Sequence, residues 1–124
     1  MDASAARDID ELSAFCPRFH HAVELVGRRW SGAILRAMFA GNTRFSDIAS
    51  TVPGLSDRLL SERLKELTQE GLVDRVAHQD SGRVEYHLTT MGRELAPVIE
   101  CLSDWADRWL PASSVADAVT PPAR

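Results

Sequence analysis

The chain is poor in cysteine and has no long apolar run, and both absences narrow its class. Cys16 and Cys101 are the only two cysteines among 124 residues; they lack the paired spacing of a zinc site and are too few for a disulfide scaffold. No stretch approaches the roughly 18 apolar residues of a membrane helix. The acidic N-terminus also lacks the basic and hydrophobic segments of a signal peptide. These absences predict a cytoplasmic protein with no membrane contact.

The chain also has no excess of positive charge. Fourteen Lys and Arg residues stand against 18 Asp and Glu residues, and the net charge of −4 gives no general support for nucleic-acid binding. Residues 17–52 are basic overall, because their arginines outnumber the acids, whereas residues 53–88 are acidic overall. Any contact with DNA must therefore come from a local basic surface rather than from the summed charge.

Apolar residues recur at helical spacing through the first half of the chain. Pro17 suits the first position of a helix, which makes Cys16 its N-cap. Pro53-Gly54 forces a turn, and Ser56 after it is a good N-cap for another helix. The predicted helices cover residues 17–27, 30–40, 45–52 and 57–70.

The period then changes from helical to alternating. Val73–Ala77 and Val84–Leu88 are predicted strands, and Asp80-Ser81-Gly82 between them is a turn, so the two strands form a hairpin. Thr89 follows as the cap of one last long helix, which runs to about Trp109.

Three helices with a tight turn, followed by a hairpin, predict a winged helix-turn-helix within a mainly helical α+β fold. Surplus aromatic side chains near both ends of the chain indicate a homodimer formed through flanking helices. We expect an N-terminal arm (1–15), a domain over 16–110 with its core at about 29–88 and dimerisation helices at about 17–27 and 89–110, and a flexible tail (111–124).

The chain also carries an ordered series of short motifs: Cys16-Pro17, Gly27-Arg28-Arg29-Trp30, Arg44-Phe45-Ser46-Asp47-Ile48, Pro53-Gly54-Leu55-Ser56, Leu64-Lys65-Glu66-Leu67, Gly71-Leu72-Val73, Val84-Glu85-Tyr86, Leu88-Thr89 and Gly92. At these spacings the series, which spans roughly Cys16 to Trp109, resembles the HxlR family of bacterial regulators, relatives of the MarR group. The resemblance implies a homodimer that binds inverted repeats of double-stranded DNA near promoters. Such regulators are often repressors that a reactive small molecule or an oxidant releases.

In a winged helix-turn-helix the fourth helix lies in the major groove. Positions advance about 100° per residue, so Arg58, Ser61, Glu62 and Lys65 share the side opposite the leucines, with Ser56 at the tip. Arg58 can bond both guanine acceptors, Glu62 can accept from a cytosine amine, and Lys65 suits a phosphate. The two serines can donate to bases or phosphates. The alternative is an ordinary solvated helix face.

Two further arginines outside this helix are candidates. Arg83, at the tip of the hairpin, is placed to enter the minor groove, where negative potential attracts arginine. Arg44, at the start of the third helix, can hold a phosphate. An ordinary charged turn and a surface arginine are the respective alternatives. Arg63 falls near the apolar flank of the fourth helix and is predicted to make an internal ion pair.

Cys16 is the candidate sensor residue. At a helix N-cap the partial positive charge favours the thiolate, and Arg18 adds to it, although Asp8, Asp10 and Glu11 oppose ionisation. Free cysteine is also often a buried space-filling residue, which is the interpretation favoured for Cys101.

A small-molecule effector without covalent chemistry is the other possibility. An apolar pocket at the dimer interface could be lined by the aromatic residues Phe15, Phe19, Trp30, Trp105 and Trp109, although such residues are more often core.

Two other classes compete with a DNA-binding regulator. A winged fold can also serve as a protein-interaction module that does not bind DNA, and the acidic 53–88 segment favours that alternative. An enzyme is not expected, because no Ser-His-Asp order, phosphate loop or paired carboxylate cluster is present. His20 and His21 point about 100° apart on a helix, so we predict no metal, and no cofactor is expected.

Overall fold

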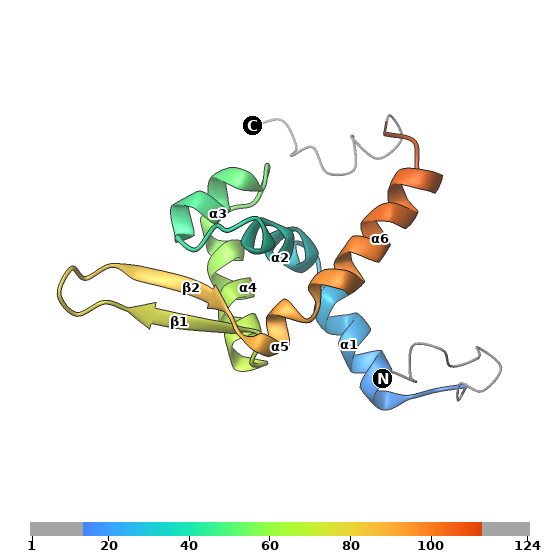
Figure 1. The fold of residues 1–124 in the computed structure, drawn as a ribbon, viewed down its shortest axis with the longest axis horizontal. Coiled ribbons are helices and arrows are strands. Elements are labelled where there is room, and N and C mark those ends of the chain that lie inside the picture. Colours follow the sequence, from blue (N-terminus) through green and yellow to red (C-terminus); the bar gives the residue numbers. More distant parts are fainter. Residues whose placement is uncertain (1–13, 113–124) are drawn as a thin grey trace.

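The computed structural model describes residues 14–112, and Figure 1 shows the order of its elements. The helices are α1 (Pro17–Gly27), α2 (Ser31–Phe39), α3 (Phe45–Thr51), α4 (Asp57–Gln69), α5 (Thr90–Arg93) and α6 (Ala96–Trp109), and the strands are β1 (Val73–Ala77) and β2 (Val84–Leu88). The mainly helical α+β fold with a two-stranded wing is confirmed. The predicted arm and tail lie almost entirely outside the described residues. Within 14–112, none of the helices is both long and apolar enough to cross a bilayer.

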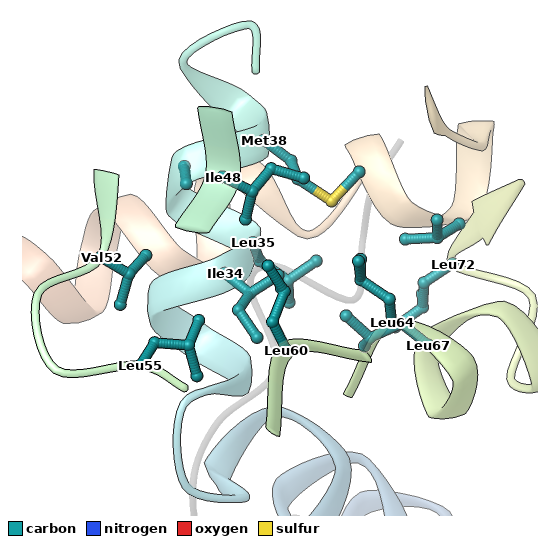
Figure 2. Packing of buried hydrophobic residues seen from close by; sticks show 12 residues of the cluster. Ile34, Leu35, Met38, Ile48, Val52, Leu55, Leu60, Leu64, Leu67 and Leu72 are labelled. Atoms are coloured by element: carbon teal, nitrogen blue, oxygen red, sulfur yellow. The ribbon is translucent and has the colours of Figure 1, made fainter. Parts of the chain in front are cut away.

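The core lies where α2, α3 and α4 meet. Leu60, Leu64 and Leu67 of α4 are buried in one cluster with Ile34 and Leu35 of α2 (Figure 2). Their spacing of three and four residues places all three leucines on one side of α4, so the opposite side of that helix faces solvent. The core therefore determines which side chains α4 can offer to a partner.

The wing is an antiparallel hairpin tied to the chain that enters α3. Its register runs from Val73 opposite Leu88 to Ala77 opposite Val84. The turn closes at Gly82, which has a φ of 71° and donates its N–H to the His78 carbonyl at 2.8 Å. Since the Tyr86 N–H also donates to the Thr43 carbonyl at 2.7 Å, the hairpin is held against the body of the domain.

Trp30, predicted to lie inside the second helix, precedes it instead. Its φ of 79° is left-handed, a conformation that an α-helix of L-residues excludes, so α2 begins at Ser31. Such a conformation costs of order 1–3 kcal/mol. The indole packs against the core and lies 5.2 Å from the Arg29 guanidinium, and these contacts hold the residue in place.

Our prediction of a single last helix is wrong: α5 ends at Arg93, and a separate helix, α6, begins at Ala96. Pro97 explains the break, because its ring lacks an N–H and clashes with the carbonyl four residues earlier, at Arg93. The tight α5 turn is instead capped by Thr89, whose Oγ1 accepts the Gly92 N–H at 3.0 Å. As a result α6 leaves the domain in its own direction (Figure 1).

Candidate nucleic-acid interface

The candidate residues of α4 lie together on its outer side. Ser56 caps the helix by accepting the Leu59 N–H on its Oγ at 3.1 Å, as predicted, and its hydroxyl proton stays free to donate. The side chains of Arg58, Ser61, Glu62 and Lys65 are all exposed. The exposed face is therefore continuous from the N-terminal tip through the third turn of α4.

Arg58 and Glu62 form a pair along this face. The Arg58 Nε donates to Glu62 Oε2 at 3.3 Å, one helical turn away, and the arginine side chain is 87% exposed. Glu62 Oε1 also lies 3.9 Å from Arg63 Nη1. Both oxygens of Glu62 therefore face arginine, and one of them accepts the bond from the Arg58 guanidinium.

Arg63 makes the internal ion pair that the sequence predicts. It is only 8% exposed, its Nη1 lies 3.6 Å from Glu66 Oε2, and its Nε donates to the Arg29 carbonyl at 2.9 Å. This arginine therefore anchors the segment between α1 and α2 on α4 and is not part of the outer face.

The two other candidate arginines lie apart from α4. Arg83 is exposed beside the wing turn, and its carbonyl accepts the His78 N–H at 2.7 Å. Arg44 is exposed and immediately precedes α3. The structure thus brings the α4 residues together but leaves Arg44 and Arg83 as separate positions around them.

Arg75 and Tyr86, which the sequence alone did not indicate as site residues, share a groove with α4. The two residues are directly paired across the hairpin. The groove has a volume of about 310 Å³, and its lining includes Ser61 and Lys65 of α4. Alternation from buried Val73 could have placed Arg75 on this face of the hairpin, but only the packing of the wing against α4 shows what it faces.

Cys16 is the N-cap residue of α1, as predicted, and is partly buried. Its thiol makes no capping hydrogen bond of normal geometry, yet the nearby N–H of Phe19 lowers the pKa of Cys16. The N–H and the guanidinium of Arg18 also lower it, and partial burial opposes the shift. The thiolate is therefore more populated near neutral pH than in a free cysteine.

Cys101 differs from expectation, and the five aromatic residues of the predicted interface pocket are divided between core and surface within the single chain. Cys101, predicted to be packed, is exposed on α6. Trp30 packs against the core, whereas the four other members of that set expose about half or more of their surface: Phe15 64%, Phe19 69%, Trp105 52% and Trp109 65%. One chain alone therefore does not form the five-residue aromatic pocket.

Known proteins resemble this chain over nearly the whole described domain. Residues 25–114 match the HxlR-like helix-turn-helix family. The HTH-type transcriptional regulator YvaP of Bacillus subtilis is 45% identical over 102 residues, which cover 82% of this chain and 94% of that protein. The HTH-type transcriptional regulator YodB of the same organism is 38% identical over 98 residues, which cover 78% of this chain and 88% of that protein.

Solved structures of transcriptional regulators also resemble this chain. The reduced form of YodB matches with a TM-score of 0.70 at 37% identity, covering 77% of this chain and 95% of that one. YodB has also been solved after diamide treatment and with bound quinone. The reduced redox regulator HypR matches with a TM-score of 0.68 at 28% identity, covering 82% of this chain and 98% of that one. Because the family match extends from α2 through α6, the chain belongs to the HxlR-like helix-turn-helix family and is a DNA-binding transcriptional regulator.

Proposed function

We propose that this regulator is a homodimeric repressor that binds an inverted-repeat operator with two copies of α4 and leaves it when Cys16 is oxidised or alkylated. The observation that carries the proposal is the apolar surface of α1 and α6, which project from the side of the domain opposite the wing (Figure 1). The exposed apolar side chains on these two helices are Phe19, Val23, Val98, Leu102, Trp105 and Trp109.

The stripe on α6 is continuous. At about 100° per residue, Val98, Leu102, Trp105 and Trp109 fall within roughly 60° of one another around the helix. Monomeric proteins rarely leave such a patch in water, and two-fold pairing buries the same patch from both copies. A dimer carries two α4 helices, as two operator half-sites about 34–36 Å apart require.

The route from Cys16 to α4 runs through α1. Two side-chain contacts join these helices through their C-cap residues, Arg28 of α1 and Glu70 of α4: His21 Nε2 lies 3.1 Å from Glu70 Oε1, and Arg28 Nε lies 3.2 Å from Glu66 Oε1. A modification at the start of α1 that tilts this helix must therefore strain its contacts with α4. The diamide-treated and quinone-bound forms of YodB, and the naming of HypR as a redox regulator, support an electrophile or oxidant as the signal.

We expect Cys16→Ser to remain on its operator when diamide or a quinone releases the wild-type protein, because serine offers no thiolate to attack. A gel shift with and without the reagent measures the release. Cys101→Ser is the matched control and should still respond. If Cys16→Ser is released as readily as the wild type, sensing at this cysteine is wrong, and the aromatic surface becomes the place to seek a noncovalent effector.

We expect Arg58→Ala to cost roughly 1–3 kcal/mol of binding free energy on the operator and to flatten the preference at one base pair in each half-site. Lys65→Ala should instead weaken operator and random DNA about equally and reduce the salt dependence. Titrations on operator and scrambled duplexes at several salt concentrations separate the two effects. Equal losses on both duplexes for both variants would contradict the assigned roles.

The proposed function as a whole is tested with the duplex upstream of the protein's own gene. Footprinting should reveal two protected half-sites related by a dyad, and transcription in vitro from that promoter should fall as protein is added. Protection of a single half-site would refute the dimeric mode, and increased transcription would refute repression.

A further inference from the structure

The groove between α4 and the wing combines two cations with several free donors. Lys65 and Arg75 line it and make no ion pair in the described part of the chain. Ser61 and Tyr86 also line it, and neither hydroxyl makes a hydrogen bond within residues 14–112. The Tyr86 N–H donates to the Thr43 carbonyl, so the wing side of the groove is attached to the chain that enters α3.

The groove is lined by basic side chains and by no acidic ones. Its lining contains no carboxylate, whereas three larger grooves on the described residues each include at least one glutamate. The nearest acid of β2, Glu85, belongs to the opposite face of the hairpin, where His87 Nε2 at 2.9 Å and His78 Nε2 at 3.3 Å flank it. In a chain with a net charge of −4, this is a locally cationic hollow.

Duplex geometry identifies what such a hollow can hold. The major and minor grooves of DNA are separated by one sugar-phosphate strand, so a protein with a helix in one groove and a wing at the next must straddle that strand. The straddled strand then lies between the helix and the wing. In this protein the groove lined by Lys65 and Arg75 occupies that position.

We infer that this groove binds one backbone phosphate of the DNA in each half-site, with Lys65 and Arg75 supplying the charge and Ser61 and Tyr86 supplying hydroxyl donors. The inference rests on the proposed docking of α4 in the major groove. It adds Arg75 and Tyr86 to the DNA-binding surface as phosphate contacts that carry no base preference.

The test is Arg75→Gln, assayed on the upstream duplex and on a scrambled duplex across a range of salt concentrations. We expect an affinity loss of about tenfold or more on both duplexes. The magnitude of the slope of log affinity against log salt should fall by about one per half-site. Arg108→Gln removes the same charge from exposed α6 and should change neither quantity while the protein remains dimeric by sedimentation.

A single neutral methylphosphonate, moved along the duplex, locates the phosphate. At one position in each half-site, the neutral group should weaken binding by the wild type strongly and binding by Arg75→Gln clearly less, because only Lys65 then supplies charge there. The inference is overturned if the salt slope of Arg75→Gln is unchanged, or if every methylphosphonate weakens Arg75→Gln as much as it weakens the wild type. Neither result would affect operator binding itself. A wild type that shows no preference for the upstream duplex would instead refute the proposed operator. Tight binding of inorganic phosphate or ADP without DNA, lost in Arg75→Gln, would assign the groove to a free phosphorylated ligand.

Discussion

Trp105→Glu in α6 is expected to convert the protein into a monomer and to lower its operator affinity by about 100-fold or more. Trp105 is 52% exposed in the single chain and lies within the apolar stripe of α6. In the proposed dimer, a carboxylate there must either face the partner's stripe without a counter-charge, at a cost of several kcal/mol, or be protonated. The monomer then loses the increase in operator affinity, about 10²–10⁴-fold, that binding a second linked half-site provides.

Sedimentation equilibrium and a gel shift on the same preparations measure both effects. Asp107→Asn is the matched control, because Asp107 is exposed about 180° around α6 from Val98, away from the stripe. It should stay dimeric and bind normally. If Trp105→Glu remains a dimer at micromolar concentration, the stripe on α6 is not the dimer interface, and α1 alone must be examined.

Gly92→Ala is expected to lower the free energy of unfolding by about 3 kcal/mol, the upper part of the range for overpacked sites. A Cβ on this buried glycine would fall on the backbone carbonyl of Leu72, well inside van der Waals contact. That carbonyl cannot retreat easily, because it accepts the Thr89 N–H at 3.0 Å, and Thr89 Oγ1 donates to the Gly71 carbonyl at 2.7 Å. The turn before α5 would have to open.

Thermal and urea unfolding measure this loss, and the melting temperature should fall by roughly 10 °C or more. Gly32→Ala is the control, because its new Cβ would meet only the Val26 carbonyl, at an ordinary 3.7 Å. Alanine also favours a helix over glycine, so that variant should be as stable as the wild type or more so. Equal melting temperatures for Gly92→Ala and the wild type would mean that the Leu72 carbonyl moves freely.

Local chemistry in the sequence determined most of the elements and the outer face of α4. Ser56 caps its helix through its own hydroxyl, and the leucine spacing alone orients Arg58, Ser61, Glu62 and Lys65 outward. The hairpin follows from alternation and from Gly82 in the turn. The break before α6 was equally local, since Pro97 removes a helical hydrogen bond, and a stricter use of that rule would have found it.

Tertiary structure alone decided which separate elements meet. Trp30 takes a left-handed conformation, which is unfavourable for a residue with a side chain. Its packing against the core and the hydrogen bond from Arg63 to the Arg29 carbonyl outweigh that conformational cost. Arg75 and Lys65 line one groove only because the hairpin packs beside α4. The spacing of residues within either element does not predict that the two side chains come together. Capping and side-chain periodicity act within a few residues of the chain, whereas these contacts depend on how the buried surfaces of distant segments fit together.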